Sequence, residues 1–313
     1  MRVVDLHCDT LYKKVTRSVP LDHPDNEVRF ETPAGSHKLQ CCAIWLPDTF
    51  SGYRAEQTVF AAAEQLKAEC QRLGISLLSP GASCRQAFEA NGNTVYFTVE
   101  NGSALNGKLE NVGRFAALGV RMMTLTWNAA NLIGDGADAE NPKGLTRFGR
   151  AAVAEMEKHG IIVDISHASE PLFYDVAANT RLPFVASHSD AFSVTPHRRN
   201  LTDGQIKVII ERGGLFGLNF HNAFLNSDPE SASVYDIIRH AEHFLSLGGE
   251  NSLCFGSDFD GGVLPRDFCD SRVYYRVYEL FLQQNYKESL IRKIFFDNAL
   301  NFFENFDNSI RML

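Results

Sequence analysis

The chain has 313 residues, of which 44% are hydrophobic and 22% are charged, and its formal net charge is −8. This composition is that of a globular protein with a sizeable core, and the acidic balance argues against nucleic acid or an anionic membrane surface as the main partner. No apolar run approaches the roughly 18 residues of a membrane span, no signal peptide precedes the first strand, and the seven cysteines contain no Cys-x-x-Cys, so we expect a cytoplasmic protein without a disulfide framework.

Apolar, β-rich runs alternate with helical patterns along the chain. The predicted strands are Val3–Leu6, Leu39–Trp45, Thr94–Val99, Arg121–Thr126, Ile161–Ile165, Phe184–Ser187, Gly214–Phe220 and Ser252–Gly256. The predicted helices, most of which stop at a glycine, are Arg54–Leu73, Leu105–Leu118, Thr146–His159, Ser169–Ala178, Thr202–Arg212, Ser231–Leu247, Tyr274–Gln284 and Lys287–Phe306. We expect long loops over Lys13–Ser36, which is polar and contains three prolines, and over Trp127–Gly144, which is rich in Asn and Gly.

This alternation predicts the fold class. Strand–helix units that follow one another without interruption indicate an α/β protein, a (β/α)8 TIM barrel formed by residues 1–313 as a single domain. The near-continuous apolar character of the strands is typical of parallel strands buried on both faces. A doubly wound open sheet is the alternative.

The first predicted strand ends in two residue types that bind metals. His7 and Asp9 are two positions apart, and side chains at that spacing in an extended chain point to the same side. A neutral imidazole and a carboxylate are suitable ligands for a borderline ion such as zinc. Taken alone, His-x-Asp is also common at solvated strand ends.

Comparable residues reappear where later strands end. Glu100 follows the third strand, His167 the fifth, His188 the sixth and Asp258 the eighth. In a barrel of this kind the chemistry lies at the carboxyl ends of the strands, so these side chains are expected to meet. Together with the first strand they predict a metal site.

The number of ligands indicates more than one ion. Three histidines with Asp9 and Glu100 exceed the needs of one structural zinc and suit two ions about 3.5–4 Å apart. Glu100 is the natural bridge because each of its oxygens can bind one ion. His7 and Asp9 would then hold one metal, and His167 and His188 the other.

The remaining acids have other predicted roles. A water between two cations is acidified enough to supply hydroxide near neutral pH, and Asp258 can accept its proton and later give it to a leaving amine. Asp5, Asp164 and Asp260 either support the ring N–H groups of the histidines or are ordinary strand-edge and turn residues.

With these residues in place, the sequence resembles the membrane (renal) dipeptidase family, peptidase family M19 of the amidohydrolase superfamily. The motifs that carry the resemblance run in family order across the chain: Asp5-Leu6-His7-Cys8-Asp9, Glu100-Asn101-Gly102, Leu125-Thr126-Trp127-Asn128, Asp164-Ile165-Ser166-His167, Ser187-His188-Ser189, Arg198-Arg199-Asn200 and Gly256-Ser257-Asp258-Phe259-Asp260-Gly261. The resemblance implies a barrel with two Zn²⁺ per chain bridged by Glu100. It also implies hydrolysis of dipeptides, often with a D-residue at the C-terminal position, and commonly a homodimer.

The resemblance also places the family's substrate-carboxylate arginine at Arg199. A guanidinium group binds one carboxylate through two parallel hydrogen bonds, and a free carboxylate held there would restrict cleavage to very short peptides. The alternative is an arginine paired with a surface aspartate. The motif alone separates Arg199 from Arg198.

Two positions depart from the family pattern. Trp127 stands where the mammalian enzymes have a histidine that helps to polarise the scissile carbonyl, and His221 stands where the family often has a tyrosine. Trp127 either walls a substrate pocket or packs in the core, and Asn128 can donate to a substrate carbonyl. His221 either faces the substrate or is a loop histidine without a catalytic task.

Other histidines and cysteines have simpler interpretations. His240 and His243 lie three apart on a predicted helix and are expected to be exposed. Cys41 and Cys42 are expected to pack as small apolar groups. Cys8 is expected to point away from the ligands on either side of it.

We therefore predict a zinc-dependent dipeptidase that acts on small-molecule dipeptides through a metal-bridging hydroxide. A metal-dependent hydrolase of another small amide or an N-acyl amino acid on the same barrel is the alternative, because Trp127 leaves the substrate range open. A non-catalytic metal-binding barrel is the third hypothesis.

Overall fold

The computed structural model describes residues 1–30, 35–79 and 81–311. Its strands are β1 (Arg2–Cys8), β2 (His37–Trp45), β3 (Ser76–Leu78), β4 (Asn93–Glu100), β5 (Val120–Thr124), β6 (Ile162–Asp164), β7 (Val185–Ala186), β8 (Leu215–Leu218) and β9 (Leu253–Phe255). Its α-helices are α1 (Thr10–Arg17), α2 (Gly52–Leu73), α3 (Cys84–Asn91), α4 (Glu110–Ala117), α5 (Arg147–Lys158), α6 (Glu170–Asn179), α7 (Asp203–Glu211), α8 (Asn222–Leu225), α9 (Val234–Ser246), α10 (Val273–Gln283), α11 (Glu288–Arg292) and α12 (Asn298–Ile310).

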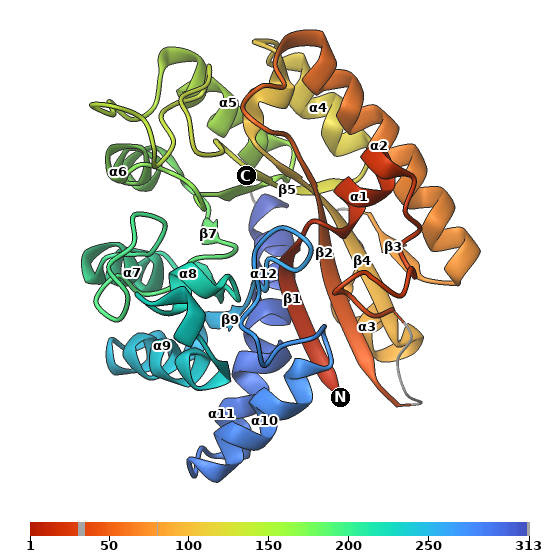
Figure 1. Cartoon of the computed structure of the whole chain (residues 1–313). Helices are drawn as coiled ribbons and strands as arrows, with labels where there is room; N and C mark the ends of the chain where they lie inside the picture. The colour runs from red at the N-terminus through yellow and green to blue at the C-terminus, as the bar shows by residue number, and fades with distance from the viewer. Residues whose placement is uncertain (31–34, 80, 312–313) are drawn as a thin grey trace.

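The strands close into a barrel (Figure 1). The order around the ring is β1, β2, β4, β5, β6, β7, β8 and β9, and β9 pairs with β1. Every pairing between these strands is parallel, and the helices cover the outside of the ring. The predicted (β/α)8 barrel is confirmed. The alternative of an open sheet is excluded, because the pairing of β2 with β4 closes the row of strands into a ring.

Several predicted boundaries were wrong. The segment 13–36, predicted to be a loop, overlaps the second half of helix α1, which ends at Arg17. Residues 31–34 of this segment lie outside the described part of the chain. The structure adds α3 and the three-residue β3, which pairs beside the start of β4. The helix predicted from Leu105 begins only at Glu110, because a 3-10 turn, η1 (Gly102–Leu105), precedes it.

Local sequence explains where the helices start and stop. The side chains of Thr146, Ser169 and Thr202 each accept a backbone N–H of the first turn of the helix that follows. Gly74 ends α2 in the left-handed conformation, with φ of +65°. These stops return the chain to the next strand.

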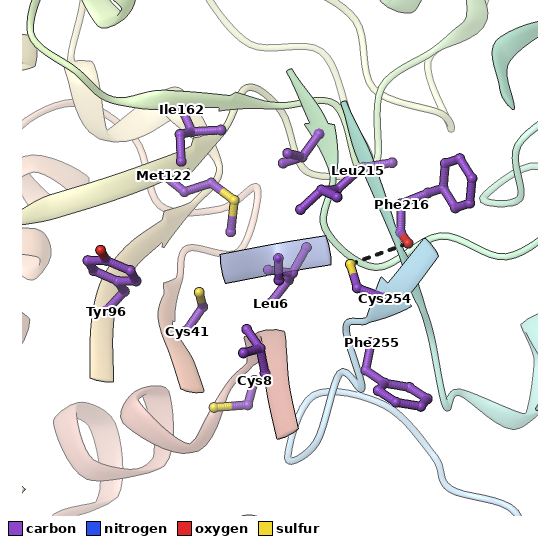
Figure 2. Close-up of a cluster of buried hydrophobic side chains, with 14 of the residues drawn as sticks. Leu6, Cys8, Cys41, Tyr96, Met122, Ile162, Leu215, Phe216, Cys254 and Phe255 are labelled. Atoms are coloured by element: carbon purple, nitrogen blue, oxygen red, sulfur yellow. Dashed lines mark hydrogen bonds between the residues drawn. The ribbon is translucent and has the colours of Figure 1, made fainter. Parts of the chain in front are cut away.

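The barrel interior is filled with apolar side chains (Figure 2). Leu6, Cys41 and Met122 turn toward the space that the strands enclose, whereas Phe216 and Phe255 turn away from it. Phe216 stacks on Phe244 of α9 at a centroid distance of 4.4 Å, which fixes that helix against the outside of the ring. The packed interior gives the strand ends a rigid base.

Cys41 and Cys42 are fully buried, as expected, and the Cys8 thiol lies 3.8 Å from that of Cys42. Cys8 therefore points away from the neighbouring His7 and Asp9 side chains, as expected.

Glu56 of α2 links that helix to the segment that begins α4. Its buried carboxylate accepts hydrogen bonds from Asn106 Nδ2 at 2.9 Å, Lys108 Nζ at 2.9 Å and Arg114 Nη1 at 2.8 Å. The bond from Asn106 is the largest cause that lowers the pKa of Glu56 to about 2, with Lys108 and Arg114 adding to it against the effect of burial. The carboxylate is thus tied to its ionised form.

Replacing Glu56 with Gln is expected to lower the free energy of unfolding at pH 7 by about 2 kcal/mol, because charge-assisted hydrogen bonds are lost. The folded-state pKa lies below the ordinary value near 4.5, so this stabilisation is complete above that pH and declines as the pH falls toward 2. Urea unfolding of both proteins at pH 7, 4 and 3 measures the difference. A difference that does not shrink with falling pH would contradict this assignment.

Candidate metal centre and active site

The predicted metal ligands and the predicted proton-transfer residue Asp258 meet at the carboxyl ends of the barrel strands. Their positions are His7 within β1, Asp9 directly after β1, Glu100 as the last residue of β4, His167 after β6, His188 after β7 and Asp258 after β9. The pairing of β1 with β2 shifts register between Asp5 and Cys8. Such irregularities change the direction in which side chains point and are common beside active sites. His7 lies within the shifted segment.

Glu100 lies at the centre of the cluster. Its Oε2 is 3.4 Å from His7 Nε2, and its Oε1 is 2.9 Å from His167 Nε2 and 3.9 Å from His188 Nε2. The two carboxylate oxygens therefore face different histidines. Asp9 Oδ2 lies 3.6 Å from His7 Nε2, on the Oε2 side of Glu100.

Three buried atoms of the cluster have no hydrogen-bond partner among the described residues. They are His7 Nε2, His188 Nε2 and Asp9 Oδ1. Buried polar atoms are rarely left unsatisfied, so their convergence fits cations, for which imidazole nitrogen and carboxylate oxygen are suitable donors. Three groups of ligand atoms among the described residues lie within 4.8 Å of one another: His7 with Asp9 and Glu100, Glu100 with His167 and His188, and His7 with His188 and Asp258. The first two share Glu100.

The ionisation of the clustered acids and histidines favours the binding of a cation at this site. Burial, and after it the Glu100 carboxylate, raises the pKa of Asp9 to about 8. Burial alone would raise the pKa of Glu100 too, but the adjacent His167 and His7 rings hold it well below its ordinary value. Burial lowers the pKa of His167 to about 4 and that of His188 well below 6.5, which keeps both rings neutral and able to bind a metal.

The far nitrogen of two of these histidine rings is held by the protein. His167 Nδ1 lies 2.7 Å from Asn128 Oδ1, and His188 Nδ1 lies 2.7 Å from Ser187 Oγ. Ser187 Oγ in turn donates to Asp164 Oδ2 at 2.6 Å. With Nδ1–H donated outward, Nε2 carries the free lone pair and points into the cluster, which is the usual arrangement behind metal-binding histidines.

The three acids that were considered as ring supports do not contact the rings directly. Asp164 acts through Ser187, and it also accepts the hydroxyl of Thr124 at 2.6 Å. Asp5 accepts the hydroxyl of Tyr274 at 2.8 Å and that of Ser257 at 2.6 Å. Asp260 pairs with Lys13, Thr10 and the backbone of Glu27. Asp5 and Asp164 thus tie neighbouring strand ends together, and Asp260 anchors the N-terminal loop.

Two residues of the site have unusual backbone conformations. His167 has φ of +66° and Asp258 has φ of +62°, in the left-handed region that non-glycine residues seldom adopt. Such conformations cluster at functional sites, where surrounding structure holds them. Gly261 also matters, because a β-carbon there would lie 2.0 Å from Asp9 Oδ2 and 2.6 Å from Asp258 Oδ1.

A cavity of about 630 Å³ opens above the cluster. The predicted substrate residues Arg199, Trp127, Asn128 and His221 all line it, as does Asp258. Asn128 is already engaged through Oδ1 with His167, so its main contact is with a predicted ligand.

Arg199 and Arg198 differ sharply. Arg199 is 6% exposed; its Nη2 donates to His188 O at 3.3 Å, and its buried Nε has no partner among the described residues. Arg198 is exposed and pairs with Asp138 at 2.9 Å. The surface ion pair that was considered for Arg199 is therefore made by its neighbour.

Sequence reasoning missed several residues around the cavity. His240 is fully buried, not exposed as predicted: its Nδ1 accepts the backbone N–H of Ala191 at 3.1 Å, which holds the segment that leads to Arg199. Tyr12, Trp45 and Phe224 line the cavity. Trp45 is the last residue of a predicted strand, so its position at the barrel mouth could be predicted from the rule that site residues lie at strand ends. The positions of Tyr12 and Phe224 in the cavity wall follow only from the tertiary fold.

Comparisons with known proteins agree with this site. The family model of the membrane dipeptidases, peptidase family M19, matches residues 1–311. The chain belongs to this family. It is therefore a peptide-bond hydrolase with metal ions as cofactor and small molecules as substrates.

Individual relatives support the assignment. A Klebsiella pneumoniae protein described as an uncharacterized protein in the pqqA 5′ region is 32% identical over 216 residues, which are 66% of this chain and 80% of that protein. A metallo peptidase from Rhodobacter sphaeroides, solved with a phosphinate mimic of the dipeptide L-Ala-D-Ala, matches with a TM-score of 0.86 at 26% identity, over 97% of this chain and 99% of that one. Dipeptidase AC, a family M19 metallo peptidase, matches with a TM-score of 0.84 at 28% identity, over 97% and 98% of the two chains.

Replacing Ser187 with Ala is expected to weaken metal binding, probed with zinc, by about 10–100-fold, because His188 loses the group that fixes its Nδ1. Thr124→Val is the matched control, since it removes a hydroxyl bond to the same Asp164 oxygen but contacts no histidine. Competition of each apo-protein with a coloured chelator measures the affinity. Equal zinc affinity in both variants would contradict a role for Ser187 in orienting His188.

Proposed function

We propose that the protein is a zinc-dependent dipeptidase whose substrates include dipeptides with a C-terminal D-residue. The observation that carries the proposal is the position of Glu100, whose Oε2 faces His7 and whose Oε1 faces His167 and His188. Three buried atoms of this cluster, His7 Nε2, His188 Nε2 and Asp9 Oδ1, have no hydrogen-bond partner among the described residues. His7 and Asp9 would hold one ion, His167 and His188 the other, and Glu100 would contact both. Imidazole and carboxylate ligands favour zinc, and two such ions would acidify a water and polarise a carbonyl.

Arg199 is proposed to bind the carboxylate terminus of the substrate. Its guanidinium group lines the cavity, is largely shielded from solvent and has unused donor capacity at Nε. A terminus fixed there, with the scissile bond at the ligand cluster, leaves one residue on the C-terminal side of that bond. The Rhodobacter sphaeroides relative binds a mimic of L-Ala-D-Ala, which supports a D-residue at this end.

Asp258 is proposed to move the proton. Burial raises its pKa to about 6, the His7 ring lowers it and the Glu100 carboxylate raises it further. Its Oδ1 lies 3.8 Å from His7 Nε2, and its Oδ2 accepts a hydrogen bond from Asn219 Nδ2 at 3.1 Å. A carboxyl group poised in this range can take a proton from the attacking water and give it to the leaving amine.

A small amide or an N-acyl amino acid is the second candidate substrate. Trp127 supports it, because its ring offers an apolar face on the cavity wall. We further propose a homodimer, which rests on the family resemblance, and a cytoplasmic location, which rests on the free cysteines. None of the helices within the described residues is long and apolar enough to cross a membrane.

A panel of L-L and L-D dipeptides, assayed with zinc and again after chelation, tests the function directly. We expect hydrolysis only with metal, restored on adding zinc. Asp258→Asn should retain zinc but lower kcat by about 10²–10⁴-fold, as is typical when a proton-transfer group is removed. Cleavage that continues after complete removal of metal, or cleavage of acyl amino acids alone, would overturn the dipeptidase assignment.

Arg199→Met is expected to lower kcat/KM for dipeptides by about 100-fold, mainly through KM, because the substrate carboxylate loses its buried partner. Arg198→Met is the matched control and should stay within about threefold, since exposed ion pairs contribute little. Steady-state kinetics on a single dipeptide compare the two variants. If Arg198→Met gave the larger loss, the assignment of the carboxylate partner would be wrong.

A further inference from the structure

The geometry of the cavity places the proposed carboxylate-binding residue opposite an aromatic surface. Arg199 follows β7, and Trp45 ends β2. Around the ring, three strands separate β2 from β7 in either direction: β4, β5 and β6 one way, and β1, β9 and β8 the other. Arg199 and Trp45 therefore approach the ligand cluster from opposite sides of the barrel mouth.

Trp45 packs with two further aromatic residues, Tyr12 and Trp127, and we call these three residues the aromatic wall. The Tyr12 and Trp45 rings pack edge to face with centroids 4.8 Å apart, and the Trp45 and Trp127 rings with centroids 5.1 Å apart. All three residues line the cavity. Trp127 also lies 6.0 Å from the His167 ring, so the wall begins beside the proposed ligands.

The position of Trp45 fixes the relation between the wall and the scissile bond. Trp45 is the register partner of Glu100 on the neighbouring strand. A substrate whose carboxylate contacts Arg199 and whose scissile bond lies over Glu100 must place its N-terminal residue beyond Glu100, on the side of Trp45. That residue then meets the aromatic wall.

We propose that the aromatic wall binds the side chain of the N-terminal residue, so that the enzyme prefers dipeptides whose first residue is large and apolar or aromatic. This inference rests on the proposed dipeptidase function and names its substrate class. Aromatic and aliphatic side chains gain most from burial against indole faces, through apolar area and edge-to-face packing.

Charged groups near the wall argue against a charged first residue. Lys13 is already paired with Asp260, and Arg17 is exposed at the rim without an ion pair to any described residue. A lysine or arginine side chain would lose hydration of its charged group against the indole rings. An acidic side chain would lose its hydration against two indole rings, while Arg17 is screened by solvent.

Kinetics on dipeptides that differ only in their first residue test the proposal. The zinc-loaded wild type should hydrolyse Phe-Gly and Leu-Gly with kcat/KM about tenfold or more above that of Ala-Gly, and Lys-Gly and Glu-Gly should fall below Ala-Gly. Trp127→Ala and Trp45→Leu should each remove most of the ratio by which kcat/KM for Phe-Gly exceeds that for Ala-Gly. Tyr53→Ala is the matched control, because Tyr53 is an aromatic residue that is 70% exposed and does not line the cavity.

Intrinsic fluorescence gives a second readout that does not depend on turnover. The chain contains two tryptophans, and both lie in the aromatic wall. Titration of the zinc-loaded protein with L-Phe, the expected N-terminal product, should change the emission at concentrations about tenfold lower than with L-Ala. Trp45→Phe and Trp127→Phe should each retain a change from the remaining tryptophan.

The outcomes distinguish a failure of the aromatic-wall inference from a failure of the proposed dipeptidase function. If the wild type cleaves all five dipeptides with similar kcat/KM, or if the wall variants lose Phe-Gly and Ala-Gly equally, the aromatic wall does not select the first residue and the inference is wrong. If the wild type cleaves none of them with zinc, the proposed function itself fails.

Discussion

The architecture of the site depends on one buried carboxylate. Glu100 is 2% exposed and stands among three imidazoles whose near nitrogens approach its two oxygens from different sides. Burying this many ionisable groups is unfavourable unless positive charge is added, because an isolated buried charge carries a large desolvation cost. The unsatisfied nitrogens of His7 and His188 mark where that charge would be bound.

The barrel makes this arrangement possible by bringing distant segments to one rim. The site residues lie at the ends of β1, β4, β6, β7 and β9, and some of these strands are only two or three residues long. Short strands supply few ladder hydrogen bonds, and buried side chains add others near the site. The Asp164 carboxylate accepts hydrogen bonds from the backbone N–H and the hydroxyl of Ser187. The Asp5 carboxylate accepts the same two hydrogen bonds from Ser257. The same groups that hold neighbouring strand ends together thus also orient His188.

Much of this could be predicted from the sequence. The barrel strands, the glycine stops and the ligand set follow from periodicity and from the rule that chemistry lies at strand ends. Other features depend on tertiary packing. The burial of His240 comes from the β7 loop folding over α9, and a three-residue strand such as β3 leaves no periodicity. Likewise, the contact between Asn128 and His167 joins residues 39 positions apart, which no local pattern encodes.

The departures from the family pattern gain a physical meaning in the fold. Trp127 packs against Trp45 and lines the cavity, and the proposed aromatic wall would give it a part in substrate choice. The central claim remains that Glu100 joins two cations. Anomalous diffraction at the zinc edge from crystals of the zinc-loaded protein tests it most directly. The account predicts two peaks about 3.5–4 Å apart, one beside each Glu100 oxygen; a single peak, or two peaks away from Glu100, would contradict it.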